Sequence, residues 1–164
     1  MFKAILGAVA ILSLGSAALA QPDKSDSDDA RWSIAIHGGA GTINRDKITP
    51  EQDATIRAAL GEALAAGSKI LKDGGKAIDA ITATIMILEN DPNFNAGKGA
   101  VFTWDKTNEL DSSIMDGSDL SAGAVARISG TKNPILLARA VKDKSPHVML
   151  SGAGANQFSR EQGL

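Results

Sequence analysis

Apolar residues change their spacing partway along this chain, from a helical period to a strand period. In residues 49–72 they recur three and four positions apart, after a start in which Thr49 and Gln52 form a capping box. Residues 76–88 form a second predicted helix, which is apolar almost all round and therefore expected to be buried on several sides. From residue 100 onward, strand-like runs alternate with turn residues. This order predicts the α+β class, with helices layered on a sheet.

Strands are predicted at 32–36, 100–104, 109–115, 121–128 and 147–151. The three runs between 100 and 128 have the spacing of an antiparallel meander. Further helices are predicted from 133 to about 143 and from 154 onward. Because no strand follows the last helix to close the sheet, one sheet edge is expected to meet a partner.

The first thirty residues divide into two segments that differ in composition. Residues 1–20 have a lysine at the front, an apolar run and a small-residue end, as a secretory signal does, and the run is shorter than the ~20 residues of a membrane span. Residues 21–30 hold four aspartates and no large apolar side chain, which predicts a flexible acidic tether. We therefore expect an exported protein, periplasmic or secreted, with residues 31–164 as its one folded domain and no membrane attachment after signal cleavage.

The charge balance and the absence of cysteine exclude several classes of function. The chain has 17 basic and 19 acidic side chains with no basic stripe, so nucleic acid is not an expected partner. With no cysteine, disulfides, zinc thiolates and cysteine nucleophiles are excluded within these residues. His37 and His147 are the only histidines, and no His/Glu spacing indicates a metal site.

Residues 89–103 read ENDPNFNAGKGAVFT, and their AGKG raises the question of a phosphate-binding loop. A Walker loop requires glycine where Pro92 stands and Ser or Thr where Gly99 stands. The spacing therefore argues against a nucleotide site. Turn chemistry alone would explain the glycines and asparagines of a loop without any ion.

Two other motifs suggest chemistry that the rest of the chain does not complete. His37-Gly38-Gly39-Ala40-Gly41 resembles the oxyanion loop of lipases, but no G-x-S-x-G nucleophile elbow occurs in these 164 residues. Asp111 and Asp116 are conceivable as paired carboxylates for glycoside chemistry. The simpler interpretation is that Asp116 shapes a turn with Gly117 and that Asp111 accepts hydrogen bonds from backbone donors.

Taken together, six segments in order resemble the plant-type asparaginases, also called isoaspartyl peptidases. They are IAIHGGAG, LENDPNFNAGKGAVFT, ELDSSIMDG, SAGAVA, KNPILLAR and SPHVMLSGAGANQF. The resemblance implies an N-terminal nucleophile hydrolase with an αββα sandwich, made as a precursor that cuts itself into α and β subunits. This chain would be the α-subunit portion, lacking the β-subunit half.

The resemblance also implies the chemistry. A threonine freed at the start of the β subunit, beyond Leu164, would attack the amide of asparagine or a β-aspartyl peptide, with its own α-amine as base. No organic cofactor is implied, and the chain alone is expected to be inactive. Ser121-Ala122-Gly123-Ala124-Val125-Ala126 is a near match to the nucleophile strand. However, such a strand also belongs at this place in family α subunits, and a cut there would leave too few residues to complete a sandwich.

The resemblance, carried over residue by residue, assigns the family's supporting residues to two segments, 37–41 and 88–98. Asn95 corresponds to an asparagine close to the nucleophile. His37, Gly38, Gly39 and Gly41 match the loop whose movement helps precursor processing. A structural sodium ion would be held by the backbone carbonyls of Leu88, Glu89, Asp91, Phe94, Ala96 and Lys98. The Lys98 side chain is expected to point to solvent.

The resemblance also names partners and leaves alternatives open. The implied partners are a β subunit from the same precursor, a second αβ unit in an (αβ)2 assembly, and a small-molecule or peptide substrate. Within the family, a glycosylasparaginase-like amidase is the alternative. Outside it, the alternative is a non-catalytic exported domain that binds a small ligand.

Overall fold

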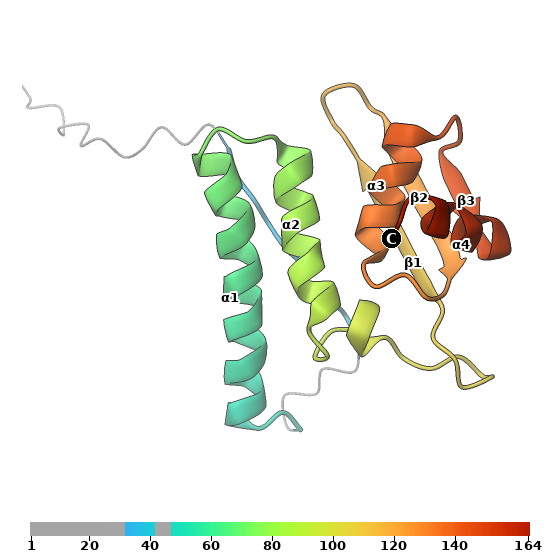
Figure 1. Cartoon of the computed structure of the whole chain (residues 1–164). Coiled ribbons are helices and arrows are strands. Elements are labelled where there is room, and N and C mark those ends of the chain that lie inside the picture. Colours follow the sequence, from blue (N-terminus) through green and yellow to red (C-terminus); the bar gives the residue numbers. More distant parts are fainter. Residues whose placement is uncertain (1–31, 42–46) are drawn as a thin grey trace, which may run out of the picture. The chain divides into compact units, whose positions relative to one another are not determined.

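The first half of the folded region is a pair of helices. A computed structural model of the chain describes residues 32–41 and 47–164 (Figure 1). Helix α1 spans Pro50–Lys72 and α2 spans Ala77–Asn90. The predicted capping box is confirmed, because the Gln52 amide donates to Thr49 Oγ1 at 3.2 Å and the Thr49 amide donates to Gln52 Oε1 at 3.0 Å. The predicted signal, 1–20, and tether, 21–30, lie outside the described residues.

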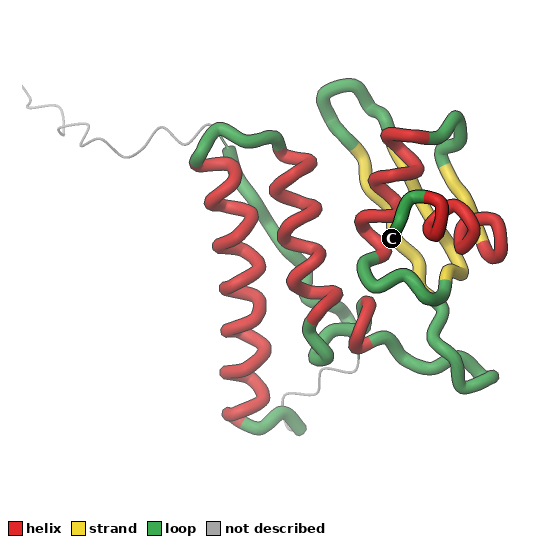
Figure 2. The backbone as a smooth tube through the Cα atoms, in the orientation of Figure 1, coloured by secondary structure: helices red, strands yellow, loops and turns green. Residues whose placement is uncertain are grey.

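A glycine allows α1 and α2 to approach closely. A Cβ on Gly67 would collide with the Thr84 hydroxyl and would lie 2.6 Å from the Ile34 side chain. Only a residue without a side chain fits there. The segment 32–41, which contains Ile34, runs along the helix pair in extended form (Figure 2). None of the helices in the described ranges combines the length and apolar character needed to cross a bilayer.

The second half contains a small mixed sheet. Strand β1, Leu110–Met115, pairs antiparallel with β2, Ala122–Ile128, and β2 pairs parallel with β3, Met149–Ser151. Helices α3, Pro134–Lys144, and α4, Gly152–Glu161, lie on the same face of the sheet (Figure 1). A short 3₁₀ helix, η1, covers Gly97–Gly99 in the connection between the halves.

The main core lies between α3, α4 and the sheet. Its most deeply buried large side chains come from β2 and α3: Val125, Ile128, Ile135, Leu137 and Val141. A second, smaller cluster joins α1 to the end of α2, where Phe94 packs with Leu88 and Ala63. The loop after α2 is thus tied to the helix pair through Phe94.

Two predicted strands are wrong. Residues 32–36 alternate between exposed and half-buried side chains, as a strand does, but no ladder partner for them lies among the described residues. Residues 100–104 are not a strand because side chains take up their backbone groups: Val101 N–H donates to Asn95 Oδ1, and Asn108 Nδ2 donates to the carbonyls of Ala100 and Val101. The predicted three-strand meander is therefore the single hairpin β1–β2.

Asp111 and Asp116 accept hydrogen bonds within the hairpin, as the simpler interpretation of the sequence predicts. Asp111 Oδ1 accepts the Arg127 amide at 2.7 Å, where a bulge interrupts the β1–β2 register and Arg127 has φ +53°. Asp116 Oδ1 accepts the amide and the hydroxyl of Ser118 at 3.0 and 2.7 Å. These bonds lower the pKa of Asp116. The two carboxylates are occupied in building the hairpin.

Candidate functional site

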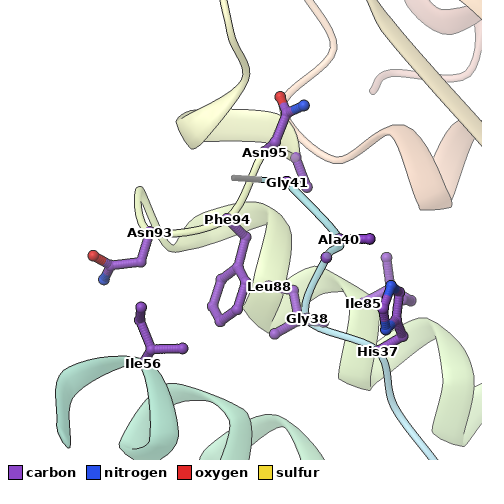
Figure 3. Close-up of a pocket in the computed structure, with 12 residues that line it drawn as sticks. His37, Gly38, Ala40, Gly41, Ile56, Ile85, Leu88, Asn93, Phe94 and Asn95 are labelled. Atoms are coloured by element: carbon purple, nitrogen blue, oxygen red, sulfur yellow. The ribbon is translucent and has the colours of Figure 1, made fainter. Parts of the chain in front are cut away.

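A cavity of about 500 Å³ lies between the glycine-rich loop and the loop after α2. Its apolar wall is formed by Ile56, Ile85, Leu88 and Phe94, and Figure 3 shows the Phe94 ring pointing between Leu88 and Ile56. Its rim is the backbone of residues 37–41 on one side and of 93–96 on the other. Two segments about fifty positions apart in sequence therefore meet at one opening.

The glycine-rich loop fits this place because it lacks side chains. A Cβ on Gly38 would lie 3.1 Å from Leu60 and 3.4 Å from Phe94, so the backbone runs directly over the second apolar cluster. Gly39 has φ +118°, a conformation that side-chain-bearing residues rarely adopt. His37 and Gly41 stand at the two ends of the same rim, and both are exposed. The predicted processing-loop residues therefore lie together.

Asn95 lies on the opposite rim with its carboxamide exposed. Its Oδ1 accepts the Val101 amide at 3.0 Å, which fixes the orientation of the group. Within the described ranges, Nδ2 has no hydrogen-bond partner, and Figure 3 shows the carboxamide turned away from the Phe94 ring. The geometry leaves a polar donor available at the mouth of the cavity.

No described residue that lines this cavity carries a hydroxyl, thiol or amine side chain. The lining offers an imidazole, two carboxamides and backbone groups, which can orient a substrate or stabilise a developing charge. No hydroxyl, thiol, amine or carboxylate nucleophile is among the described lining residues.

The candidate cation loop, residues 88–99, is wound so tightly that carbonyl oxygens surround two glycines. A Cβ on Gly97 would collide with the Glu89 carbonyl, and a Cβ on Gly99 would collide with that of Phe94 and lie 2.6 Å from that of Pro92. Several predicted ligand carbonyls accept one amide each, those of Leu88, Asp91, Phe94 and Ala96. Each keeps a second lone pair.

Side chains of this loop do not form a metal site. Among the described residues, no group of three or more His, Asp or Glu side chains could hold an ion. The Asp91 carboxylate instead accepts two hydrogen bonds from Asn93, at 2.8 and 2.7 Å. Lys98 is exposed. A cation here would depend on backbone oxygens, a donor set that suits a hard, weakly charged ion.

Glu89 has a side-chain role that the sequence did not indicate. Its side chain is almost fully buried, with Oε2 accepting Asn133 Nδ2 at 3.0 Å and Oε1 accepting the Ile135 amide at 2.9 Å. Burial raises the pKa of this carboxyl, and the two hydrogen bonds oppose the rise. Glu89 thereby caps the first turn of α3 from α2 and attaches the loop to the sheet layer.

Comparison with known proteins identifies the family to which this chain belongs. The family model described as Asparaginase matches residues 30–164. This chain belongs to the asparaginase family. It is 48% identical over 131 residues to the isoaspartyl peptidase of Escherichia coli (strain K12), covering 80% of this chain and 41% of that protein. It is likewise 48% identical over 131 residues to the plant-type L-asparaginase of Pyrococcus abyssi, with 80% and 41% covered.

A more distant relative gives the same picture. The isoaspartyl peptidase/L-asparaginase of Mus musculus is 41% identical over 143 residues, which are 87% of this chain and 43% of that protein. The chain thus spans less than half the length of these asparaginase-family relatives. The family has the N-terminal nucleophile hydrolase fold, and the mixture of helices and sheet in this chain agrees with it.

Proposed function

We propose that this chain is the α-subunit portion of an isoaspartyl peptidase/L-asparaginase that cuts itself into two subunits. One observation carries the proposal: the cavity rim brings the glycine-rich loop and Asn95 together, yet no described lining residue carries a hydroxyl, thiol or amine nucleophile. A site built this way needs a reactive group from another segment. The threonine of the family pattern, on a β subunit, fits that need.

In the proposed reaction, the threonine hydroxyl attacks the side-chain carbonyl of asparagine or of a β-aspartyl peptide. The α-amine of the same threonine accepts the proton, an acyl-enzyme forms as the amine leaves, and water releases aspartate. Asn95 Nδ2 would donate a hydrogen bond at the reacting centre, oriented by the Val101 amide on Oδ1. The loop 37–41 would adapt its backbone during precursor cleavage, with Gly39 as its most permissive residue.

The uncovered face of the sheet supports the αββα sandwich. Ser113 on β1, Ala124 on β2 and Met149 on β3 are register partners, so they stand on one face. Met149 is 54% exposed and Met115 of the same strand face is 53% exposed, whereas α3 and α4 cover the other face. A second sheet could pack on this face and bury the two methionines. The β subunit is the proposed source of that sheet.

We also propose a structural sodium ion in the loop 88–99. Its ligands would be the backbone carbonyls of Leu88, Glu89, Asp91, Phe94, Ala96 and Lys98. The tight winding around Gly97 and Gly99 supports it, because these positions let carbonyls converge without a side chain between them. The ion would hold the loop, and so Asn95, in place and take no part in bond breaking. Export of the protein and an (αβ)2 assembly remain part of the proposal.

Activity assays on two proteins test this function. The first is the purified 164-residue chain, and the second is a chimera in which residues 31–164 replace the matching part of the Escherichia coli isoaspartyl peptidase. The chimera should release ammonia from asparagine and cleave a β-aspartyl dipeptide, and the chain alone should do neither. Ammonia from the chain alone, or an inert but folded chimera, would refute the proposal.

A pair of asparagine variants in the chimera tests the role of the rim. Asn95→Ala should lower activity by about 10²-fold or more, as loss of a donor at a developing charge does. Asn93→Ala is the matched control, because Asn93 lines the same cavity but is bonded to Asp91. Equal losses in the two variants would assign Asn95 no special role.

A further inference from the structure

The loop at residues 100–108, here called the aromatic loop, exposes three large apolar side chains. Val101 is 66%, Phe102 is 72% and Trp104 is 98% exposed. Single exposed apolar residues are ordinary, but three within four positions concentrate exposed apolar surface in one short loop. No contact among the described residues buries this tryptophan.

The exposure does not come from a loose segment. Thr103 N–H donates to the Thr107 carbonyl at 2.7 Å and the two threonine hydroxyls lie 2.9 Å apart, which closes the tip. Asn108 Nδ2 donates to the carbonyls of Ala100 and Val101 at 2.8 and 3.2 Å, which closes the base. Lys106, within the tip, has φ +59°, a left-handed conformation that is strained for a residue with a side chain. These hydrogen bonds hold the loop in a defined shape in which its apolar side chains are exposed.

The aromatic loop is also connected to the candidate site. Its Val101 amide is the group that fixes Asn95 Oδ1, so the loop begins one hydrogen bond away from the carboxamide. In the proposed function, a segment that brings a nucleophile to Asn95 would lie near the start of this loop. The relatives extend well beyond the matched part, and that further length is available to cover the patch.

We propose that the aromatic loop is the docking surface for the nucleophile-bearing β subunit, with Phe102 and Trp104 as its anchors. The inference rests on the proposed function, since it names the partner of the same site. Aromatic side chains that become fully buried at an interface carry a large share of binding energy. The patch therefore couples association of the β subunit to the placement of Asn95.

The charges of the loop favour this partner over a membrane. Its tip carries one aspartate, Asp105, and one lysine, Lys106, which cancel. Adsorption to an anionic bilayer would call for a cluster of basic residues beside the apolar ones. A neutral apolar patch is instead suited to burial against protein.

Trp104 reports directly on the proposed contact. Acrylamide quenching is measured on the chain alone and on the chimera, each compared with its Trp104→Phe variant so that the difference isolates Trp104. We expect strong quenching of Trp104 in the chain alone and clear shielding in the cleaved chimera. In the chimera, Trp104→Ala combined with Phe102→Ala should weaken association of the two cleaved polypeptides by at least about tenfold.

Leu120→Ala is the matched control, because Leu120 is 70% exposed and lies beyond the opposite end of β1. It should leave the association unchanged.

An accessible Trp104 in an active, cleaved chimera would overturn the docking proposal alone. A shielded Trp104 in an uncleaved, inactive chimera would overturn the proposed function alone. Shielding that rises with concentration of the chain alone would assign the patch to a second copy, and shielding by phosphatidylserine vesicles to a membrane; either result overturns the proposal.

Discussion

The packing of α3 and the neighbourhood of Asn95 differ in how completely this chain finishes them. Around α3, large side chains are fully buried and the helix start is capped by Glu89. At Asn95, a donor and a cavity mouth stand open, and Trp104 of the loop that bonds Asn95 is exposed. The first region is packed by residues of this chain, and the second is open to solvent. The difference marks the place where the proposed β subunit would bind.

Truncation of one large side chain in each region tests the comparison most strongly. Leu137→Ala should lower the free energy of unfolding by about 2–5 kcal/mol, because Leu137 is fully buried and its loss leaves a cavity. Phe102→Ala should change it by less than about 0.5 kcal/mol, because Phe102 is exposed in the chain alone. Urea unfolding of the 164-residue protein measures both. Similar effects would break the distinction between the two regions.

Removal of the Glu89 side chain tests the link between them. Glu89→Ala should destabilise the chain by about 2–4 kcal/mol, because it leaves the Ile135 amide and the Asn133 carboxamide unpaired in a buried place. Glu89→Gln keeps an acceptor for the Ile135 amide and should lose less. Glu62→Ala, at an exposed position on α1, should be nearly neutral in the same unfolding experiment. A neutral Glu89→Ala would show that the cap does not hold α3.

A methyl group on Gly99 tests the tight winding of the loop beside Asn95. Gly99→Ala should cost about 1–3 kcal/mol, because the new Cβ would meet the carbonyls of Phe94 and Pro92. Gly117→Ala meets nothing within 4 Å and serves as the control. If the loop holds sodium, the melting temperature should rise in sodium chloride relative to choline chloride at equal ionic strength, and Gly99→Ala should lose that rise. A tolerated Gly99→Ala would contradict the carbonyl packing.

The capping box at the start of α1 should have a smaller effect than these. Thr49→Ala removes the acceptor for the Gln52 amide and should lower stability by about 1 kcal/mol. Thr49→Ser keeps that acceptor and should restore most of the loss. Thermal unfolding followed by circular dichroism compares the three proteins, and equal melting temperatures would exclude a role for the cap.

The smallest expected effect is a dependence on pH at the end of α3. Hydrogen bonding from Lys142, with further help from Arg139, holds the pKa of Asp143 below its ordinary value of 3.8. Arg139 also contacts Asp79 of α2 at 2.6 Å, and Asp116 and Asp119 face Lys142. A lowered folded pKa means that the contribution is present above pH 3.8 and is lost as the pH falls through the folded value. Because Asp143 is partly exposed, the contribution should be about 0.5 kcal/mol.

Urea unfolding at several pH values measures this contribution as the difference between the protein and Asp143→Asn. The difference should be present at pH 6 and should shrink below pH 3.8. A difference that grows on acidification would have the opposite sign and would contradict the assignment of Lys142 and Arg139 as stabilising partners.

Local signals predicted the fold where the deciding contacts are also local. The capping box of Thr49 and Gln52 and the turn role of Asp116 depend on neighbours two or three positions apart, and the β1–β2 hairpin joins strands that follow each other directly in the chain. The strand at 32–36 failed because a ladder needs a partner, and none lies among the described residues. The strand at 100–104 failed because Asn95 and Asn108 took up its backbone groups.

The candidate site was predicted in part for the same reason. Sequence motifs located the loops that meet at the cavity, through their resemblance to a family. The buried role of Glu89 could not be seen, because its partner Asn133 lies 44 positions away and a lone glutamate at a helix end is usually solvated. The exposure of Trp104 was equally invisible, since an aromatic residue in a strand-like run is ordinarily expected in a core.

Mass spectrometry of the purified chimera tests the central claim most directly, namely that residues 31–164 support a nucleophile carried by another segment. The account predicts two polypeptides, with the first ending beyond Leu164 and the second beginning with threonine. The Escherichia coli remainder expressed without residues 31–164 should stay uncut. A chimera that folds but remains one polypeptide, or one cut between Leu120 and Ser121, would contradict it.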